Sequence, residues 1–429
     1  MADTNIQEDK NRRSEAQLET KGLGEALDFD EAILRAQGHR VQLERSFSWL
    51  GALGLAFSIV NSWLTYAACF GVTYSYGGGP VAIFSPIISA TVQWIMLLGV
   101  AELSSAFPSS GGQYHFTYMV APEGYKAFAA YIVGSINVVA WWQRIENMTE
   151  TAMFLSILGF ALVVIVCLVM GRGSYHPSSL VEFRSTSGWT TGPGWMLAIG
   201  NGEYAFAAAG ACVHIAEEIP NPSRKIPLVM FVFPALHVLL EPRLSLKVIS
   251  PFFSDMEAVQ NSFLPSLELF YQGTGSKAAA ACLQAYLTIL YYTCVPSQWI
   301  TSSRMTWAFS RDNGLPFSNY WSEVDKKRNI PVRATLLSAG FCVVYGLLYI
   351  ASTQAFNSII NTAVLMLNIT YTVPQAILMV QGRHILPSRP LNLGRSGYLV
   401  HLFSVLWLIL SGIFFCFPTT NPPTLGNMN

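Results

Sequence analysis

Apolar side chains run along this chain in ten long blocks that are separated by shorter polar stretches. The blocks lie at residues 48–70, 80–101, 127–142, 151–170, 195–216, 226–240, 278–303, 334–354, 356–380 and 397–417. Nine of them contain no Asp, Glu, Lys or Arg, and the block at 195–216 contains only Glu203. A helix that crosses the roughly 30 Å hydrocarbon layer of a bilayer needs about 20 apolar residues. The pattern therefore predicts an all-α membrane protein with nine or ten spans.

Composition and charge agree with that assignment. Hydrophobic residues make up 52% of the chain and charged residues 12%, whereas soluble domains carry about 25% charged residues. The formal net charge is zero, and basic residues lie beside the blocks rather than on one compact face, which argues against nucleic acid as a partner. All seven cysteines fall inside apolar blocks without a CxxC pair, so we interpret them as buried small residues.

The polar N-terminal segment indicates how the chain is oriented. Residues 1–46 lack the apolar core of a cleaved signal peptide, and we expect a disordered cytosolic tail. Arg35, Arg40 and Arg45 precede the first block, and basic residues beside a span favour the cytosolic side. The expected division is a tail at 1–46, a multi-pass transmembrane domain at 47–417 and a short, truncated C-terminal tail at 418–429.

The number of spans conflicts with the position of the most basic loop. Loop 304–333 carries six Lys and Arg side chains and should be cytosolic. Seven blocks lie between the tail and this loop, and an odd number of crossings would place the loop outside. Either one span is missing between the blocks at 127–142 and 151–170, or the short, proline-containing block at 226–240 does not cross. Both alternatives remain open on sequence grounds.

Two blocks have small residues at their centres, where a transmembrane helix can unwind. The first carries them between Gly51 and Ser58, and the fifth carries them between Gly200 and Cys212. Such residues either let helices pack closely or mark a break that lines a cavity. A pair of broken helices aims half-helix N-termini, each with about half a positive charge, at an anionic group, while free carbonyls receive a cation. A zwitterion can then be bound without any charged side chain.

Four ionisable residues in or beside the blocks are candidates for a role in function. Glu203 lies early in its block, and because a carboxylate at the centre of a span costs about 2.5 to 3.5 kcal/mol, we expect it at the membrane interface. Glu102 follows the second block and is expected to cap or pair at the membrane edge. His214 is either a packing residue or a proton relay. Glu217 belongs to an acidic edge before a proline turn.

Three motifs resemble the amino acid, polyamine and organocation transporter superfamily, in particular its fungal GABA, choline and amino-acid permeases. They are ELSSAFPSSGGQY at 102–114, HIAEEIPNP at 214–222 and SRMTWAFSRDNGLP at 303–316. The resemblance covers about residues 30–429, which is more than isolated motif matches would produce. It implies a leucine-transporter-like inverted-repeat bundle of twelve spans, which is incomplete here with nine or ten.

The resemblance also implies a site. Substrate would be held where the first and sixth family spans unwind. Apart from the resemblance, Glu102, His214 and Glu217 are candidates for a proton relay or gate. The corresponding substrate-binding positions are Gly54, Ala56, Phe57, Ser58, Phe206, Ala209 and Gly210. Ala56 and Gly210 depart from the usual family residues. Relative to the family, the fourth span is absent after Trp142, the seventh is altered around 231–253, and the twelfth is absent.

The sequence as a whole favours a proton-coupled secondary transporter, or permease, for an amino acid or related amine such as GABA or choline. We expect it in the plasma membrane, with the substrate, protons and the lipid bilayer as its partners. The alternative is a transport-dead truncated permease that acts as a membrane sensor or partner, or a chain that arises from an imperfect gene model. No enzyme is predicted, because the chain lacks GxSxG, Walker and His/Glu metal-site patterns, and neither cofactor nor metal is implied.

Overall fold

The computed structural model describes residues 30–423, apart from 40–41, 46, 143–148, 171–180, 250–254, 256–257, 260–261, 263, 328 and 352. Within these residues the regular elements are helices, and the only strand-like contact is a bridge between Asp325 and Ile330. The fold class predicted from the sequence, an all-α membrane protein, is confirmed. In the described part of the chain, six helical stretches are long and apolar enough to cross a membrane: Trp49–Ala67, Gly78–Ala106, Met153–Met170, Lys277–Arg311, Thr362–Gln381 and Ser396–Phe415.

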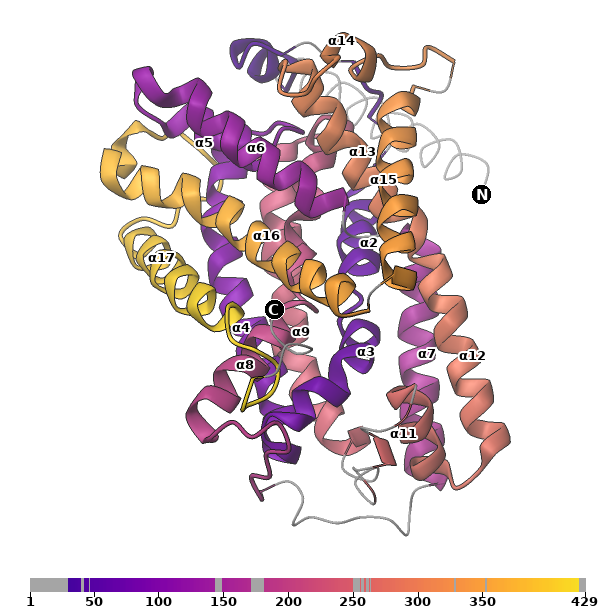
Figure 1. The fold of residues 1–429 in the computed structure, drawn as a ribbon. Coiled ribbons are helices and arrows are strands. Elements are labelled where there is room, and N and C mark those ends of the chain that lie inside the picture. Colours follow the sequence, from indigo (N-terminus) through magenta and orange to yellow (C-terminus); the bar gives the residue numbers. More distant parts are fainter. Residues whose placement is uncertain are drawn as a thin grey trace, which may run out of the picture.

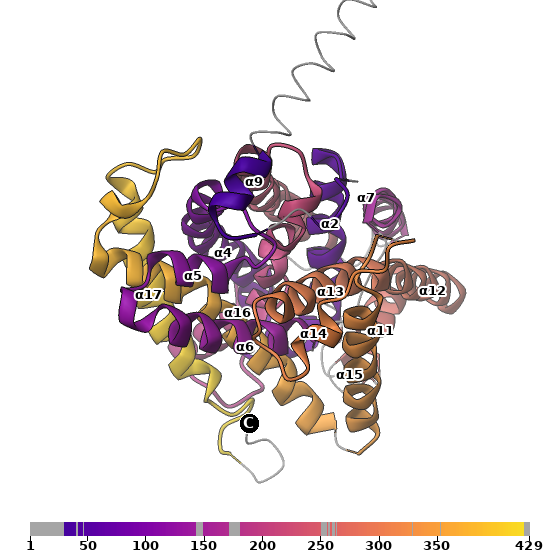
Figure 2. The ribbon, with the colours of Figure 1, turned by 90° about the horizontal axis from the view of Figure 1, so that it is seen from above.

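The helices form one elongated bundle, with α7 and α12 together at one flank and α17 at the opposite flank (Figures 1 and 2). The first half contains α2 (Trp49–Val60), α3 (Ser62–Ser75), α4 (Gly78–Ala106), α5 (Gln113–Val120), η1 (Glu123–Tyr125), α6 (Lys126–Trp142) and α7 (Thr149–Met170). The second half contains α8 (Thr191–Glu203), η3 (Ala207–Glu218), α9 (Pro222–Ile249), α11 (Pro265–Thr274), α12 (Lys277–Thr293), α13 (Val295–Arg311), α14 (Ser318–Trp321), α15 (Val332–Ala351), α16 (Thr353–Gln381), η5 (Arg383–Ile385) and α17 (Ser396–Phe415).

Two of the spans are broken near their middles. The first is split at Asn61, whose backbone is left-handed (φ 31°, ψ 56°), between α2 and α3. The second is split at residues 204–206, between α8 and the 3₁₀ helix η3. Two broken spans were predicted, but the first was placed between Gly51 and Ser58, where α2 is a regular helix. The small residues there are buried and allow close helix packing, so the chain breaks only after them.

The two broken spans lie side by side and run in opposite directions. At the end where α2 begins, the Phe47 N–H donates to the Glu218 carbonyl at the end of η3 (3.1 Å). At the other end, the Asn201 amide of α8 donates to the Thr73 hydroxyl of α3 (2.7 Å). This antiparallel pairing of broken spans is the arrangement that an inverted repeat produces. We call the end where α2 begins and η3 ends the N-side of the bundle.

The direction of α13 follows from two contacts with the first broken span. The Ser58 and Ser297 hydroxyls are 2.6 Å apart, and the Asn61 amide donates to the Cys294 sulfur at 3.2 Å. Because the residue number rises along α2 while it falls along the α13 span, the two run antiparallel. The α12–α13 span therefore ends on the N-side.

The direction of α6 follows in turn from its contacts with α13. The Tyr131 and Phe309 rings lie 6.1 Å apart, and the Asn137 amide donates to the Met305 sulfur at 3.5 Å. From the first contact to the second, the residue number rises on α6 and falls on α13. Helix α6 is therefore antiparallel to α13, and it leaves the N-side in the same direction as α2.

Helix α7 also runs in this direction. The Ser156 hydroxyl donates to the Asn61 amide oxygen (2.7 Å), and the Phe160 ring lies 5.6 Å from the Trp63 ring, so α7 is parallel to the first broken span. Consecutive helices that both leave the N-side, joined by only residues 143–148, lack a return crossing between them. The directions of α6 and α7 therefore favour the first of the two sequence alternatives, a span missing between their two blocks.

Helix α9 weakens one ground for the second alternative, the shortness of the block at 226–240. It is a single helix of 28 residues, about 42 Å long at 1.5 Å per residue, which is enough to cross a bilayer. The block at 226–240 was considered too short to cross, and the seventh span was expected to be altered around 231–253. The helix extends to Ile249 and residues 250–253 lie outside the described part of the chain, so the altered seventh span stays a prediction.

Part of the N-terminal tail is folded onto the bundle. The sequence predicted a disordered tail at 1–46. Residues 30–36 are nevertheless helical. The buried Asp30 carboxylate accepts the Asn221 N–H (2.8 Å) and pairs with Arg45 (3.3 Å). Residues 1–29 lie outside the described part.

Candidate functional site

The break in the first span is held by side chains of α7 and of the α12–α13 span. Asn61 is fully buried, and its amide oxygen accepts a hydrogen bond from Ser156 of α7. Ser156 in turn accepts one from the Trp63 indole at 2.8 Å. Asn is one of the few residue types that adopts the left-handed region readily. A polar residue with partners on α7 and at Cys294 therefore fixes where the helix breaks.

The break in the sixth family span leads into an unusual helix. Element η3 covers 12 residues of 3₁₀ type that are interrupted by a kink at Ile215 (φ −104°, ψ 18°), and 3₁₀ stretches longer than three or four residues are uncommon and often mark a functional hinge. The Tyr371 hydroxyl of α16 donates to the Ala207 carbonyl at 2.7 Å. A Cβ atom at Gly210 would lie 2.7 Å from the same hydroxyl oxygen, so glycine is needed for this close approach. The start of η3 is thus pinned against α16.

The predicted substrate-binding positions lie on these two neighbouring helices. Six of them are buried: Gly54, Ala56 and Ser58 of α2, Phe206 at the start of η3, and Ala209 and Gly210 of η3. Phe57 is half-buried and its ring makes an edge contact with Phe233 of α9, with 6.0 Å between the ring centres. Ala56, Phe206 and Ala209 belong to one apolar cluster, and Phe57 packs against it. The structure therefore brings both sets together, and their role in binding stays a prediction.

A buried carboxylate stands directly before the second break. Glu203, the last residue of α8, has no exposed surface, which differs from the interfacial position expected from the sequence. It accepts hydrogen bonds from the Asn368 amide (2.6 Å), the Trp407 indole (2.6 Å) and the Gln93 amide (3.2 Å). These donors come from α16, α17 and α4, which is why the sequence around Glu203 did not reveal them.

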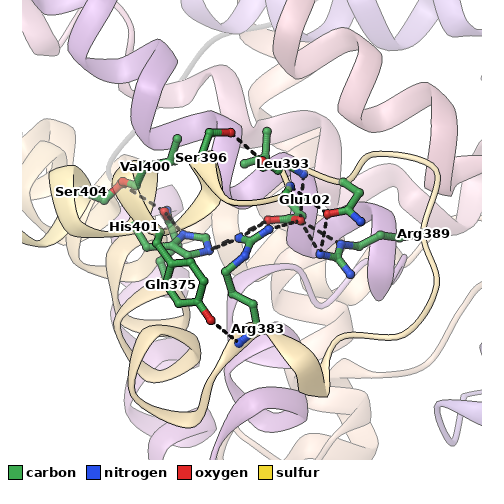
Figure 3. Close-up of polar contacts among 12 residues, drawn as sticks. Glu102, Gln375, Arg383, Arg389, Leu393, Ser396, Val400, His401 and Ser404 are labelled. Carbon is green, nitrogen blue, oxygen red and sulfur yellow. Dashed lines mark hydrogen bonds and ion pairs between the residues drawn. The ribbon is translucent and has the colours of Figure 1, made fainter.

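Glu102, at the N-side end of α4, is the centre of a cluster of charges (Figure 3). Both Arg383 guanidinium N–H groups donate to it at 2.6 Å, and Arg389 donates to it at 2.5 and 2.9 Å. The Leu393 N–H adds a bond of 3.1 Å. His401 lies 2.8 Å from the Arg383 guanidinium. The expectation that Glu102 caps or pairs is met, and its partners lie in η5 and the loop before α17.

Two further ion pairs fasten η3 to α13 on the N-side. Arg304 binds Glu218 through two hydrogen bonds of 2.7 and 3.0 Å, and Arg311 contacts both oxygens of Glu217 at 2.9 and 3.1 Å. Glu217 also accepts the Ser110 N–H at 3.2 Å. All four charged side chains are largely buried, which makes these pairs structural ties between the second broken span and its neighbour.

The residues named as a possible proton relay or gate do not form one chain. His214 is buried, its Nδ1 lies 3.1 Å from the Ser110 carbonyl, and its ring packs edge-on against Trp141. It therefore shares Ser110 with Glu217, whereas Glu102 belongs to the separate cluster on α4. His214 Nε2 has no hydrogen-bond partner among the described residues.

The tail and the Tyr114 motif meet at Asp312, just beyond α13. The Tyr114 hydroxyl donates to the Asp312 carboxylate at 2.7 Å, and His39 lies 3.4 Å from it. Burial alone would raise the pKa of Asp312, but the hydrogen bond with His39 and the charge of Arg311 outweigh burial and hold this pKa at about 2. The carboxylate therefore stays ionised at physiological pH and ties three segments together.

Gly112 in the SSGGQY motif is required by its backbone and its neighbour. Its φ of 58° and ψ of −129° are accessible almost only to glycine, and a Cβ atom would lie 2.8 Å from His214 Cε1. We expect Gly112→Ala to cost about 1 to 3 kcal/mol from backbone strain alone, measured as a lower unfolding temperature in detergent. Gly124→Ala is the matched control, because no atom lies within 4 Å of its Cβ position. Equal effects of the two substitutions would contradict this interpretation.

An all-helical bundle with two antiparallel broken spans that meet in its interior is an architecture typical of membrane transporters. The family model described as amino acid permease matches residues 142–429. The chain belongs to the amino acid permease family. The resemblance to the amino acid, polyamine and organocation superfamily and its fungal permease branch is thereby confirmed.

Similar proteins cover nearly the whole chain. A choline transporter of Saccharomyces cerevisiae is 28% identical over 94% of this chain and 81% of its own length. Amino-acid permease 2 of Neurospora crassa is 25% identical over 97% and 86%, and a GABA-specific permease of S. cerevisiae is 24% identical over 85% and 74%. Among solved structures, a manganese transporter of Eremococcus coleocola superposes with a TM-score of 0.45 at 13% identity, covering 85% of each chain.

Proposed function

We propose that the protein is a secondary active transporter that moves an amino acid or a related amine, such as GABA or choline, and is driven by the proton gradient. The observation that carries the proposal is the pair of broken spans lying side by side at Asn61 and at residues 204–206. Membership of the amino acid permease family and the similarity to choline, GABA and amino-acid transporters support it. We place it in the plasma membrane with the N-side facing the cytosol.

The substrate site in this proposal lies where the two broken spans face each other. Helices α3 and η3 begin at the breaks, and their N-termini would attract a carboxylate, while carbonyl groups at the end of α2 would receive an ammonium group. Phe57 and Phe206 would contact the apolar part of the substrate, and aromatic rings also attract quaternary ammonium groups. The small residues Ala209 and Gly210 on η3, with Gly54, Ala56 and Ser58 on α2, would set the size of the site.

The charge clusters on the N-side act as the gate in this proposal. Glu102 and Glu217 lie on α4 and η3, and their arginine partners lie on α13 and between α16 and α17. A path from the breaks to the N-side opens only when these pairs separate. His214, beside Glu217, packs at the same level and would move with η3.

Uptake into proteoliposomes tests the proposal. The purified chain would be reconstituted and supplied with labelled amino acids, GABA and choline under an inward proton gradient. One charge moved across 100 mV contributes about 2.3 kcal/mol, which sustains an accumulation of about 50-fold. We expect at least one compound to accumulate, and a protonophore to abolish this. Failure of every compound, both in gradient-driven uptake and in exchange, would overturn the proposal.

One observation favours a second candidate, a permease-like membrane protein that binds its ligand without transporting it. Helices α6 and α7 point the same way across a six-residue connection, so one span of the family scaffold is missing. Loss of a scaffold helix could leave the site intact while preventing the moving helices from rocking. Saturable binding of choline, GABA or an amino acid without uptake or exchange would favour this candidate.

A further inference from the structure

Glu203 differs from the other buried carboxylates of the bundle in having only neutral partners. Glu102, Glu217 and Glu218 each bind one or two arginines. Glu203 is equally buried, but its three hydrogen-bond donors are the amides of Gln93 and Asn368 and the indole of Trp407. A buried charge without a counterion is costly even when it is hydrogen-bonded, so this carboxylate has a reason to take up a proton that the others lack.

The helices around Glu203 bring no charge to it among the described residues. Four titratable groups on α3, α4, α16 and α17 have hydrogen-bond partners other than Glu203. Glu102 binds arginines, His401 lies between Arg383 and Gln375, and the hydroxyls of Tyr371 and Tyr66 donate to the carbonyls of Ala207 and Ala82. Proton uptake at Glu203 would therefore change the charge of this region by one full unit.

The surroundings of Glu203 can serve a protonated side chain as well as a carboxylate. Gln93 donates through Nε2 to both Glu203 and Asn368, while its own Oε1 is buried and lacks a hydrogen-bond partner in the described structure. Rotating a side-chain amide by half a turn exchanges donor for acceptor. A protonated Glu203 could then donate its O–H to Gln93 Oε1, in exchange for the hydrogen bond that Gln93 Nε2 now donates to Asn368 Oδ1.

The position of Glu203 links its protonation to the broken span. It is the last residue of α8, and the break follows at residues 204–206. The carboxylate ties α8 to α16 and α17 through two hydrogen bonds of 2.6 Å. Hydrogen bonds to an ionised group are roughly twice as strong as those to a neutral one, so protonation loosens this tie next to the hinge.

We propose that Glu203 is the proton-binding site of this transporter, with Gln93, Asn368 and Trp407 as the groups that hold its two protonation states. Uptake of one proton converts the carboxylate to a carboxylic acid, releases α8 from α16 and α17, and allows η3 to move with its substrate. Release of the proton on the other side restores the tie. The inference rests on the proposed transport function for its role in coupling, but proton binding itself can be measured without transport.

Infrared difference spectroscopy of the reconstituted protein tests proton binding directly. Between acid and neutral pH we expect the carbonyl band of a protonated carboxylic acid, and we expect Glu203→Gln to remove one component of it. Glu123→Gln, on the exposed η1, is the matched control and should leave this component unchanged. A wild-type difference spectrum identical to that of Glu203→Gln would overturn the proposal, whether or not the protein transports.

Transport assays distinguish a role of Glu203 in proton coupling from a role in substrate binding. We expect Glu203→Gln to lose gradient-driven accumulation by at least about tenfold while keeping substrate exchange between equal concentrations. Accumulation at the wild-type level would overturn the role in coupling. If the wild type accumulates nothing, the proposed function fails, and the infrared result still decides whether Glu203 binds a proton.

The variant Trp407→Phe provides a second test, which is still available if the Glu203→Gln variant does not fold. It removes one donor to the carboxylate and keeps the aromatic ring. Because this hydrogen bond stabilises the ionised carboxylate more than the neutral acid, we expect the pH at which the band is half developed to rise by about one unit. An unchanged midpoint would contradict the assignment of the band to Glu203. Size-exclusion chromatography confirms that each variant is folded.

Discussion

Replacement of Glu102 by alanine is expected to destabilise the folded protein by about 3 to 5 kcal/mol. The substitution leaves the buried guanidinium groups of Arg383 and Arg389 without their shared carboxylate, and the Leu393 N–H without its acceptor. Removal of one partner from a buried ion pair is costly because the remaining charge stays desolvated. Two arginines depend on this single carboxylate, so the loss should be at the upper end of the range.

Thermal unfolding of the purified variant in detergent measures the effect. Glu123→Ala is the matched control, since Glu123 also pairs with a cation, Lys126 at 2.6 Å, but its side chain is 90% exposed. An exposed pair contributes at most about 1 kcal/mol, so the control should stay close to the wild type. A similar small shift for both variants would show that the Glu102 cluster contributes no more than a surface pair.

The Glu102 cluster also shows what the sequence could and could not predict about the site. Its position after an apolar block suggested a carboxylate that pairs at the membrane edge, because an unpaired charge is not tolerated there. Its partner Arg383 is 281 residues away in the chain, and no local pattern joins the two. Tertiary contacts of this kind build the Glu102 cluster, and they became visible only in the folded bundle.

The spans themselves were predictable because the bilayer requires long apolar helices whatever the fold. The position of a break within a span was harder to predict, because small residues occur both in closely packed helices and at breaks. In α2 they pack closely and stay helical, and the break falls at Asn61, a single polar residue whose partners lie on α7 and at the start of α13. In the other broken span the small residues of η3 follow the break directly.

The error at Glu203 has a physical reason. The cost of a carboxylate in a span is estimated for a helix surrounded by lipid, and on that basis an interfacial position was expected. In the bundle, Gln93, Asn368 and Trp407 replace water as hydrogen-bond donors. Each lies on a different helix, so the sequence around Glu203 carried no sign of them. A lone acidic residue in an otherwise uncharged span is, for this reason, better interpreted as an internal functional group.

The number of crossings could be narrowed to two alternatives by counting basic loops. The choice between them required the directions of α6 and α7, which follow from contacts with α13 and with the first broken span. The direction of a helix in the bundle follows from its contacts with other helices, and the hydropathy of the sequence does not indicate it. The same contacts explain why the candidate site can be complete although one scaffold span is missing, since α2, α3, α8 and η3 are all present.

Asn61→Val is expected to damage the first break more than any other single substitution there. Valine is β-branched and poorly compatible with the left-handed backbone at this position, which costs about 1 to 3 kcal/mol. It also removes the acceptor of the Ser156 hydroxyl and the bond to Cys294. A buried hydroxyl that loses its partner costs about 1 to 3 kcal/mol more. The chain should relieve the strain by changing the angle between α2 and α3, which would displace Phe57 and Ser58 from the junction with η3.

Asn61→Gly separates the backbone from the side chain. Glycine adopts the left-handed conformation without strain, so this variant should lose only the side-chain hydrogen bonds. We expect its unfolding temperature to lie between those of the wild type and Asn61→Val, and we expect it to keep substrate binding that the valine variant loses. Binding is measured with the compound identified by the uptake screen. If both variants are equally impaired, the side chain of Asn61 and not the break in the helix is what the site requires.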